Sequence, residues 1–436
     1  MEIPKIIVVG GGAGGLELAT HLGKRLGKRK LAEVLLIDVK ATHIWKPLLH
    51  EVAAGTFDSH ENEIEYLAQA AHNHFRFRLG KVTGVDRDAK TVTVAPTTNE
   101  AGEVLIPERA LPYDYLIMSV GSVSHDFGVE GVRDHCLFLD TTDQAERFQR
   151  RLIESYIRFQ GHAGEDESGQ LDVAIVGAGA TGVELAAQLY EVSHLMNAYG
   201  LDNVRPADIR MTLIEAADRI LPGVTPRVSA ATHAQLEKLG INILTAETVT
   251  RVTDEGIETK SGKFVRAPIR VWAAGVKAPP FLKDFGKLSS NRIGQLEVRQ
   301  TLQTVDDDDI YAIGDCASCP WPGHERNVPP RAQSAHQMAS TAAKSIEQRV
   351  RGKSGDLPTF IYHDYGSLVS LGKYSTVGNL MGNLMGTVTL EGFIARLVYL
   401  SLYKMHQVAL FGVAKTSLLT LSHLFRRSVH PKIKLH

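Results

Sequence analysis

The chain has 436 residues, of which 44% are hydrophobic and 22% are charged, and its formal net charge is −1. These values indicate a folded protein of two to three domains and exclude a disordered chain, and the near-neutral charge argues against a nucleic-acid partner. Three cysteines, Cys136, Cys316 and Cys319, are too few for a disulfide framework and fit a reducing compartment.

The first predicted element is a strand, a glycine-rich loop and a helix at Ile6 to Ala19, IIVVGGGAGGLELA. Gly10, Gly12 and Gly15 have the G-x-G-x-x-G spacing, and the next strand ends on an acid, Asp38. The first glycine permits a tight turn, the second lets a pyrophosphate approach the backbone, and the third lets the helix pack on the strand. A helix N-terminus also attracts negative charge. The stretch therefore predicts a dinucleotide site.

The position of this strand also bears on targeting. Because the strand has begun by Ile6, no room is left for a signal peptide, and the sequence has no run of about 18 apolar residues that could form a transmembrane helix. We therefore expect the main body of the protein to be cytoplasmic and not to span a bilayer.

The next segments add one aromatic residue and several strands. Trp45 lies in ATHIWKPLLHEVAA, where it either packs in the core or anchors a loop, or lies beside a cofactor ring, and the sequence leaves both interpretations open. Phe75 to Val94 alternates like antiparallel strands, and a later apolar strand ends on Gly121.

An internal repeat decides the fold class. After a predicted helix and a polar connector at 161–170, the opening pattern returns at Asp172 to Leu189, DVAIVGAGATGVELAAQL. Its glycines, Gly177, Gly179 and Gly182, have the spacing of the first loop. A repeated strand, loop and helix predicts a second dinucleotide site.

The acid of this second unit is Glu215, at the end of MTLIE, and we attribute its late position to an insertion at 199–207. A carboxylate there accepts hydrogen bonds from ribose hydroxyls and repels a 2′-phosphate. The nearest following arginine, Arg219, is four residues away. The sequence therefore favours NADH over NADPH.

The last third continues the pattern of strands that end in small residues. VWAAGVKAPP, which contains Gly275, predicts a strand against which a cofactor lies, and Gly314-Asp315 follows another short strand. Four acids, Asp306 to Asp309, are predicted to form a solvated turn rather than a metal site. Pro329-Pro330 predicts the sharp start of a helix over 331–343.

Two further features are a pair of cysteines and an apolar, basic C-terminal tail. Cys316-x-x-Cys319 has no second pair to complete a zinc site and no redox loop around it, so we predict a packing role and no metal site in the chain. Binding of a soft metal such as Cu(I) by the pair is the alternative that stays open. The tail from Phe393 to Phe425 is apolar with scattered basic residues. It predicts an interfacial amphipathic helix on anionic lipid, with two ordinary core-packing helices as the alternative.

Together, the two glycine loops, Gly314-Asp315, the helix motif AQSAHQ at 332–337 and the basic tail resemble the type II NADH dehydrogenases. These are non-pumping, FAD-dependent NADH:quinone oxidoreductases with two dinucleotide-binding domains. The resemblance implies an α/β fold of two Rossmann-like domains, the second inserted in the first, and a C-terminal membrane-associating α/β region. We expect FAD-binding residues 1–143 and 276–345, NADH-binding residues 144–275, and a C-terminal region at 346–436.

The resemblance also implies site residues. Non-covalent FAD would be bound by Gly10, Gly12, Gly15, Asp38, Gly121, Asp315 and Gln333. NADH, the co-substrate, would be bound by Gly177, Gly179, Gly182, Glu184, Glu215 and Gly275. Quinone would be bound by Ala332, Gln333 and Gln337, with Glu184, Gln333 and Gln337 as catalytic residues. The alternatives are a first-turn helix acid for Glu184 and exposed surface amides for the two glutamines.

The expected function is FAD-dependent transfer of two electrons from NADH to a membrane quinone without proton pumping. The expected location is the cytoplasmic face of the bacterial inner membrane, as a peripheral protein held to anionic lipid by its tail. The alternatives are a sulfide:quinone oxidoreductase and an NADH-sensing flavoprotein that acts through a partner. The sequence leaves open the quinone and whether the protein is a homodimer.

Overall fold

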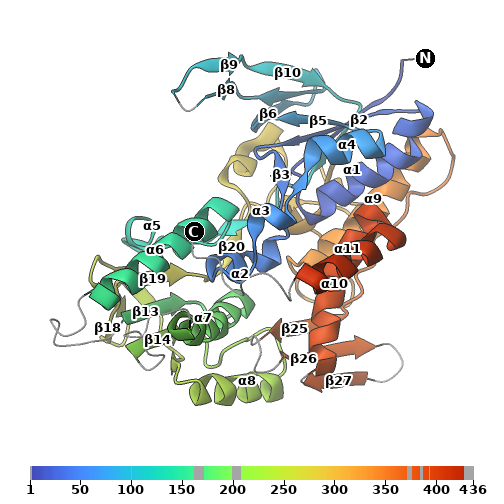
Figure 1. Ribbon diagram of the computed structural model, residues 1–436. Coiled ribbons are helices and arrows are strands. Elements are labelled where there is room, and N and C mark those ends of the chain that lie inside the picture. The colour runs from blue at the N-terminus through green and yellow to red at the C-terminus, as the bar shows by residue number, and fades with distance from the viewer. Residues whose placement is uncertain are drawn as a thin grey trace.

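The structure is a computed structural model, which describes residues 2–99, 101–161, 171–198, 208–370, 376–382, 386–391 and 393–426. The chain forms two α/β halves, with a C-terminal sheet and two helices beside them (Figure 1). The predicted insertion at 199–207 and all but the first residue of the predicted connector lie outside the described residues.

The first half is built on a six-stranded sheet in the order β22-β23-β11-β1-β2-β5. The strands are β1 (Lys5–Val9), β2 (Glu33–Asp38), β5 (Arg76–Leu79), β11 (Tyr115–Met118), β22 (Gln303–Thr304) and β23 (Asp307–Ala312). All pairs are parallel except β22 with β23. The central strands are rich in Val, Ile and Leu because both of their faces are buried. Helices α1 (Ala13–Arg25), α4 (Tyr66–Asn73) and α9 (Ala332–Val350) complete this half.

The second half repeats the plan on a smaller sheet, in the order β15-β14-β13-β19. Its strands are β13 (Leu171–Val176), β14 (Ile209–Ile214), β15 (Asn242–Leu244) and β19 (Ile269–Trp272), all parallel. Its helices are α6 (Thr142–Gly161), α7 (Ala180–Ala198) and α8 (Pro226–Lys238). A short helix of the first half, α2 (Leu49–Ala53), packs into the hydrophobic core of the second. The α/β fold with two Rossmann-like units is confirmed.

Smaller elements connect these sheets. The antiparallel sheet of β6 (Val82–Asp86), β7 (Thr91–Val94) and β10 (Arg109–Pro112) lies beside the first half, and β16 (Val249–Val252), β17 (Gly256–Thr259) and β18 (Phe264–Arg266) lie beside the second. Two-stranded pairs are β3 (Thr42–His43) with β4 (Ile64–Glu65), β8 (Thr97–Thr98) with β9 (Val104–Ile106), β12 (Val123–Ser124) with β20 (Val276–Lys277), and β21 (Leu296–Glu297) with β24 (Ala317–Ser318). Short helices are α3 (Ser59–Asn62) and α5 (Val132–His135), with 3₁₀ helices at Gly27–Arg29, Lys46–Leu48, Pro280–Lys287 and Gly314–Cys316.

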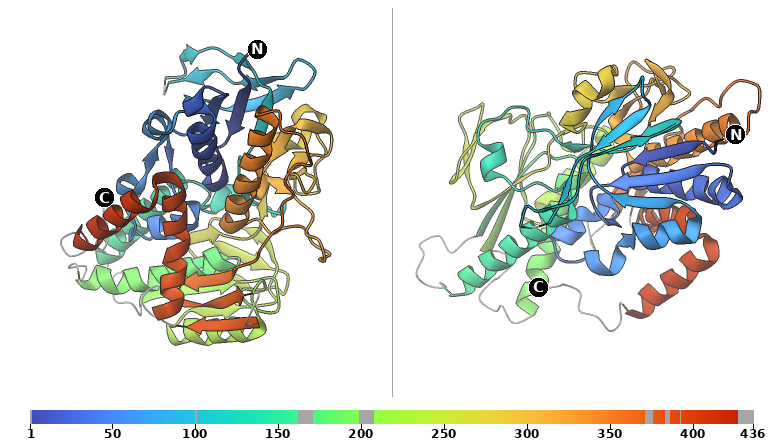
Figure 2. Two further views of the ribbon diagram at one scale, coloured as in Figure 1. Left: turned by 90° about the vertical axis from the view of Figure 1, so that its right-hand side faces the viewer. Right: turned by 90° about the horizontal axis from the view of Figure 1, so that it is seen from above.

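The C-terminal region is an antiparallel sheet followed by two helices. The strands are β25 (Gly366–Ser370), β26 (Thr376–Gly382) and β27 (Gly386–Glu391), and the helices are α10 (Phe393–Phe411) and α11 (Val413–Arg426). Gly412, with φ +79°, ends α10 as helix-terminating glycines do. Figure 2 shows both helices at the side of the molecule, where α10 packs on α1. Among the described residues, no helix combines the length and apolar character needed to span a membrane.

The two helices of the tail differ in how deeply their side chains are buried. On α10, His406, Gln407 and Leu410 are buried, so this helix fits the core-packing alternative. On α11, Leu418 and Phe425 are 70% and 75% exposed. Among the described side chains, most of the exposed apolar residues of the tail lie on α11, and Met405 and Val408 are the exposed ones on α10.

Three local predictions need correction. Within Phe75 to Val94, only β6 and β7 are antiparallel, because β5 joins the main sheet in parallel with β2. The α9 helix extends to Val350 instead of ending at Ala343. The acidic run is only partly a turn, since Asp307 already begins β23.

The acids of this run are not merely solvated. Asp306 accepts a hydrogen bond from the Ser289 backbone N–H at 2.6 Å, and the three that follow each pair with a basic side chain. The pairs are Asp307 with Arg87 at 3.1 Å, Asp308 with Arg299 at 2.6 Å, and Asp309 with both Lys90 and Arg349 at 2.5 Å. The prediction of a solvated turn missed these ion pairs, because Arg87, Lys90 and Arg349 lie 40 or more residues from their acids in the sequence.

Candidate active site

The first glycine loop has the geometry that its spacing predicts. Gly10 has φ +94°, and a Cβ on it would lie 2.4 Å from the Ser119 carbonyl oxygen. A Cβ on Gly15 would lie 1.9 Å from the Gly10 carbonyl oxygen, so the helix can approach the strand only without a side chain there. At Gly12, in contrast, the nearest atom is 4.0 Å away. The loop is therefore closed behind its first and third glycines and open in front of the second.

The second loop is built in the same way. Gly177 has φ +97°, and a Cβ on Gly182 would lie 2.0 Å from the Gly177 carbonyl oxygen. A Cβ on Gly179 would have no atom within 4 Å. Both loops thus leave open the place where a pyrophosphate approaches a helix N-terminus.

Each predicted acid is bound to its own loop. Asp38 accepts a hydrogen bond from the Gly11 N–H at 2.6 Å, and Glu215 accepts one from the Ala178 N–H at 2.7 Å. Glu215 also accepts one from the Ala217 N–H at 2.9 Å. Burial raises the pKa of Asp38, although hydrogen bonds from the backbone N–H groups of Gly11, Lys40 and Val39 act in the opposite direction. The two acids therefore occupy equivalent positions at the carboxyl ends of β2 and β14.

Residues far apart in the sequence meet at the same edge of the first sheet. Because β1, β11 and β23 are adjacent and parallel, their carboxyl ends bring Gly10, Gly121 and Asp315 together. Ser122 Oγ donates to Asp315 Oδ2 at 2.7 Å, and Lys46 Nζ donates to the Ser122 carbonyl oxygen at 2.7 Å. Sequence reasoning did not assign Lys46 or Ser122, because neither belongs to a motif.

Glu184 lies opposite a histidine that the sequence analysis missed. His50 Nδ1 on α2 is 3.7 Å from Glu184 Oε2 on α7, and both side chains are buried. Burial lowers the pKa of His50 to about 4, so this imidazole is neutral at neutral pH. The pair joins the two halves, since α2 belongs to the first and α7 to the second. No sequence pattern links the two residues.

Gly275 has a local structural role. Its φ is +64°, and a Cβ on it would lie 2.4 Å from the ring of Phe127. Phe127 in turn stacks on His125, with ring centroids 4.3 Å apart. The role of Gly275 in NADH binding stays a prediction.

The two glutamines of the AQSAHQ motif both hold the segment that leads into β25. Gln333 Nε2 donates to the Gly366 carbonyl oxygen at 3.1 Å and to Asp364 Oδ1 at 3.3 Å. Gln337 makes a paired contact with His363, donating to its carbonyl oxygen at 2.9 Å and accepting from its N–H at 3.0 Å. They are therefore not simply exposed surface amides. Ala332 begins α9, one residue after the predicted start, and its role in quinone binding stays a prediction.

The remaining candidates have packing roles. Trp45 is buried, with its ring centroid 4.4 Å from that of His406 and 6.0 Å from that of Tyr403, so it anchors α10. Cys316 and Cys319 are buried thiols, and burial raises the pKa of each to about 12. Such thiols are protonated at neutral pH, which fits the predicted packing role.

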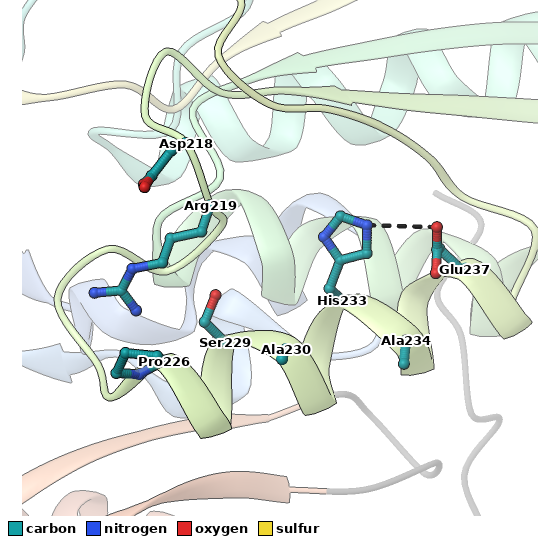
Figure 3. A pocket seen from close by; sticks show the side chains of 8 residues that line it. All are labelled: Asp218, Arg219, Pro226, Ser229, Ala230, His233, Ala234 and Glu237. Atoms are coloured by element: carbon teal, nitrogen blue, oxygen red, sulfur yellow. Dashed lines mark ion pairs between the residues drawn. The ribbon is translucent and has the colours of Figure 1, made fainter.

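A surface hollow of about 360 Å³ lies between α8 and the loop that follows Glu215 (Figure 3). Arg219 lines it, but its guanidinium donates to the carbonyl oxygens of Val224 at 2.9 Å and Pro222 at 3.0 Å. Glu237 and His233, also in the lining, pair with each other at 3.4 Å. Arg219 is thus already bound to its own loop.

Comparisons with known proteins agree with this geometry. Residues 4–339 match the family model described as pyridine nucleotide-disulphide oxidoreductase. A type II NADH:quinone oxidoreductase of Haemophilus influenzae is 41% identical over 99% of this chain and 99% of its own length. The protein of the same name from Staphylococcus aureus is 29% identical over 87% of this chain and 90% of its own length.

Solved structures share the fold. NDH2 from Plasmodium falciparum in complex with NADH has a TM-score of 0.82 at 19% identity, covering 99% of this chain and 100% of that one. The sulfide:quinone oxidoreductase of Aquifex aeolicus has a TM-score of 0.73 at 17% identity, covering 94% and 92%. The chain belongs to the pyridine nucleotide-disulphide oxidoreductases and, within them, to the type II NADH:quinone oxidoreductases, a family of enzymes that use FAD and NADH.

Proposed function

We propose that this protein passes two electrons from NADH through FAD to a membrane quinone without pumping protons. FAD would occupy the first glycine loop, in residues 1–143 and 276–345, and NADH the second, in residues 144–275. The observation that carries this proposal is the pair of equally built loops, each closed behind its outer glycines and open at Gly12 or Gly179. Two loops of this form suit two dinucleotides, and the full-length relative from Haemophilus influenzae supports the same reaction.

The residues of the first half fit FAD. The opening at Gly12 faces the N-terminus of α1, which favours a pyrophosphate, and Asp38 stands at the end of β2 where a ribose would lie. Gly121, which has open space around it, and Asp315 lie at the same edge of the sheet. When bound, FAD supplies the chemistry that accepts a hydride and releases electrons to the quinone.

The second half fits NADH. Glu215 would accept ribose hydroxyls, and Glu184, paired with His50 at the junction of the halves, would lie near the reacting rings. A buried carboxyl beside a neutral imidazole can hold a proton. We propose this role for Glu184, because quinone reduction takes up a proton besides the hydride equivalent.

We propose that the quinone binds near the start of α9, at Ala332, Gln333 and Gln337. Because both amides already hold 363–366, we infer that they shape this pocket by fixing that segment. A Gln337→Ala variant should lower kcat/KM for quinone about tenfold, since a pair of backbone hydrogen bonds is lost. Reduction of ferricyanide by NADH, which needs no quinone pocket, should be unchanged.

The matched control for this variant is Gln348→Ala. Gln348 lies on the same helix, and its amide also donates to backbone carbonyl oxygens, those of Gly355 at 3.0 Å and Asp356 at 3.3 Å. This control should retain its kcat/KM for quinone. Equal losses in the two variants would contradict a specific role for Gln337.

We propose that α11 holds the protein on the cytoplasmic face of the bacterial inner membrane, against anionic lipid. Its exposed apolar residues include Val413, Leu418, Leu421 and Phe425. Replacing Leu418, Leu421 and Phe425 by Asp should lower binding to anionic-lipid vesicles more than tenfold, because each buried apolar side chain contributes about 1.5–3 kcal/mol. Vesicle sedimentation measures this loss.

The control replaces exposed apolar residues on a different part of the surface. Val104 and Leu105 lie on β9 and are 59% and 64% exposed. A Val104→Asp/Leu105→Asp protein should bind vesicles like the unaltered chain. If this protein and the α11 variant sediment alike, α11 is not the lipid-binding surface.

A further inference from the structure

A buried chain of hydrogen bonds joins the first glycine loop to α10 and α9. It starts at the Gly11 carbonyl oxygen, which lies 2.9 Å from His43 Nδ1. His43 Nε2 lies 3.0 Å from His406 Nε2, and His406 Nδ1 lies 2.6 Å from Glu17 Oε1. The other carboxylate oxygen, Glu17 Oε2, lies 2.5 Å from His336 Nδ1. Glu17, His43 and His406 are each less than a tenth exposed.

We propose that Glu17 and His406 are positioning residues that act through His43 to hold the Gly11 carbonyl, and that they do so only while they share one proton. This inference rests on the proposed assignment of FAD to the first loop. The inference couples the docking of α10 to the geometry of the FAD loop, because one chain of hydrogen bonds joins the two.

The need for a shared proton follows from the hydrogen-bond partners. A carbonyl oxygen only accepts, so His43 Nδ1 must carry a hydrogen. Burial lowers the pKa of His43 to about 3, with the charge of His406 acting in the same direction, so His43 is neutral and its Nε2 is an acceptor. His406 Nε2 must then be the donor. One further proton is required between His406 Nδ1 and Glu17, since without it a lone pair would face a carboxylate.

Glu17 itself does not hold that proton at neutral pH. Burial alone would raise the pKa of Glu17, but the hydrogen bonds from His336 and His406 hold it below its ordinary value of 4.5. Glu17 is therefore a carboxylate at neutral pH, and its two oxygens face His336 Nδ1 and His406 Nδ1. The hydrogen bond to Glu17 likewise raises the pKa of His336 above 6.5.

The chain matters for the loop because a peptide group is planar and trans. When the Gly11 carbonyl points inward to His43, the N–H of Gly12 in the same peptide group points the opposite way. Tyr66 Oη also donates to the Gly11 carbonyl oxygen, at 2.8 Å, which fixes the same orientation. The Gly12 N–H therefore points away from His43, and we infer that it faces the bound pyrophosphate.

Other charged groups around His406 leave this assignment unchanged. Lys24 on α1 donates to the Leu410 carbonyl oxygen at 3.2 Å, and on α10 itself Lys404 bonds to Gln407 at 2.9 Å. Burial lowers the pKa of Lys24, and the charge of Lys415 on α11 lowers it further. Within strands β25, β26 and β27 the single charged residue is Glu391, and neither its side chain nor Lys373, which lies between β25 and β26, belongs to the described residues. Among the described side chains, the carboxylate that meets His406 is Glu17.

The pH dependence has a definite sign. The contribution of His336, whose pKa is raised, is complete below about pH 6.5 and is lost as the pH rises through its folded value. The contribution of Glu17, whose pKa is lowered, is complete above about pH 4.5 and is lost as the pH falls through its folded value. Because alkaline pH removes protons from the cluster of Glu17, His336 and His406, FAD retention should decline as the pH rises.

The test measures the FAD dissociation rate of the full chain between pH 6 and pH 9, from the rise in free-flavin fluorescence. The unaltered chain should release FAD about tenfold faster at pH 9, as expected for loss of a hydrogen bond to a charged group. In Glu17→Gln, the amide donates to neutral His406 Nδ1 and accepts from His336, so every bond is kept without the extra proton. This variant should retain FAD equally across the range.

Two further variants complete the test. His406→Phe, which cannot bond to His43, should release FAD about tenfold faster at every pH. Its α10 should also exchange hydrogen faster than that of the unaltered chain in flavin-free protein at one fixed pH. The control is His21→Gln, because His21 and Glu347 form a 2.8 Å pair between α1 and α9 that is partly exposed. It should keep the pH profile of the unaltered chain.

The outcomes separate this inference from the proposed function. A Glu17→Gln protein with an unchanged pH profile overturns the shared proton, and this holds even if His406→Phe fails to fold. A folded His406→Phe protein with the FAD dissociation rate of the unaltered chain overturns the positioning role. If a Gly12→Val protein instead retains FAD, the first loop does not bind it, and the proposed assignment itself fails.

Discussion

A Gly179→Val protein should fold, retain FAD and lose most of its affinity for NADH. Nothing lies within 4 Å of a Cβ at Gly179, and its φ is not positive, so the protein itself accommodates a side chain there. The free energy of unfolding should therefore change by no more than about 0.5 kcal/mol. The valine would instead occupy the approach of the pyrophosphate, where overpacking by about 1–3 kcal/mol weakens NADH binding about tenfold to a hundredfold.

The mirror variant, Gly12→Val, should fold but lose FAD. Rapid-mixing measurements of flavin bleaching against NADH concentration, with flavin content determined on the same samples, distinguish the two losses. Gly223→Val is the control, since Gly223 also has open space around it and no positive φ, and it lies in the second half outside the glycine motif. If Gly179→Val binds NADH like this control, the second loop is not the NADH site.

A Glu215→Gln protein should use NADPH about tenfold to a hundredfold better relative to NADH. The substitution removes the charge that would repel a 2′-phosphate, an effect on the order of 1.4–3 kcal/mol. The new amide can still accept from the Ala178 N–H, but it leaves the Ala217 N–H without its acceptor. Stability should therefore fall by about 1–3 kcal/mol. The ratio of kcat/KM for the two nucleotides measures the change in preference.

Glu237→Gln provides the matched control for charge. Glu237 lines the hollow beside Arg219, so its replacement removes one negative charge from the same surface without touching the loop (Figure 3). Its NADPH preference should equal that of the unaltered chain. An equal shift in both variants would mean that general surface charge, and not Glu215, sets the preference.

Local features of the sequence predicted much of this fold. The strands that precede each glycine loop, the loops themselves and the acids Asp38 and Glu215 were recognised because their patterns lie within a few tens of residues. The geometry at Gly10 and Gly177, both with positive φ, agrees with the tight turn that the spacing predicts.

Long-range contacts explain what the sequence did not reveal. Glu17 looks like an ordinary helix residue, but it is buried, and its partners His336 and His406 are 319 and 389 residues away in the chain. His50 gains its role from a contact with Glu184 across the two halves, and Lys46 from a bond to Ser122, 76 residues away in the first half. The motif glutamines were expected at a quinone pocket. Their bonds to 363–366 join residues 26 to 33 positions apart, which no local pattern reveals.

The most direct test of the central claim is steady-state oxidation of NADH by the full-length, detergent-purified flavoprotein. The assay compares a soluble quinone analogue with oxygen as acceptor, and sulfide with NADH as donor. We expect rapid NADH oxidation with quinone, slow oxidation with oxygen, and no quinone reduction by sulfide. NADH turnover that does not depend on quinone, or a long-lived NADH complex with negligible turnover, would contradict the account.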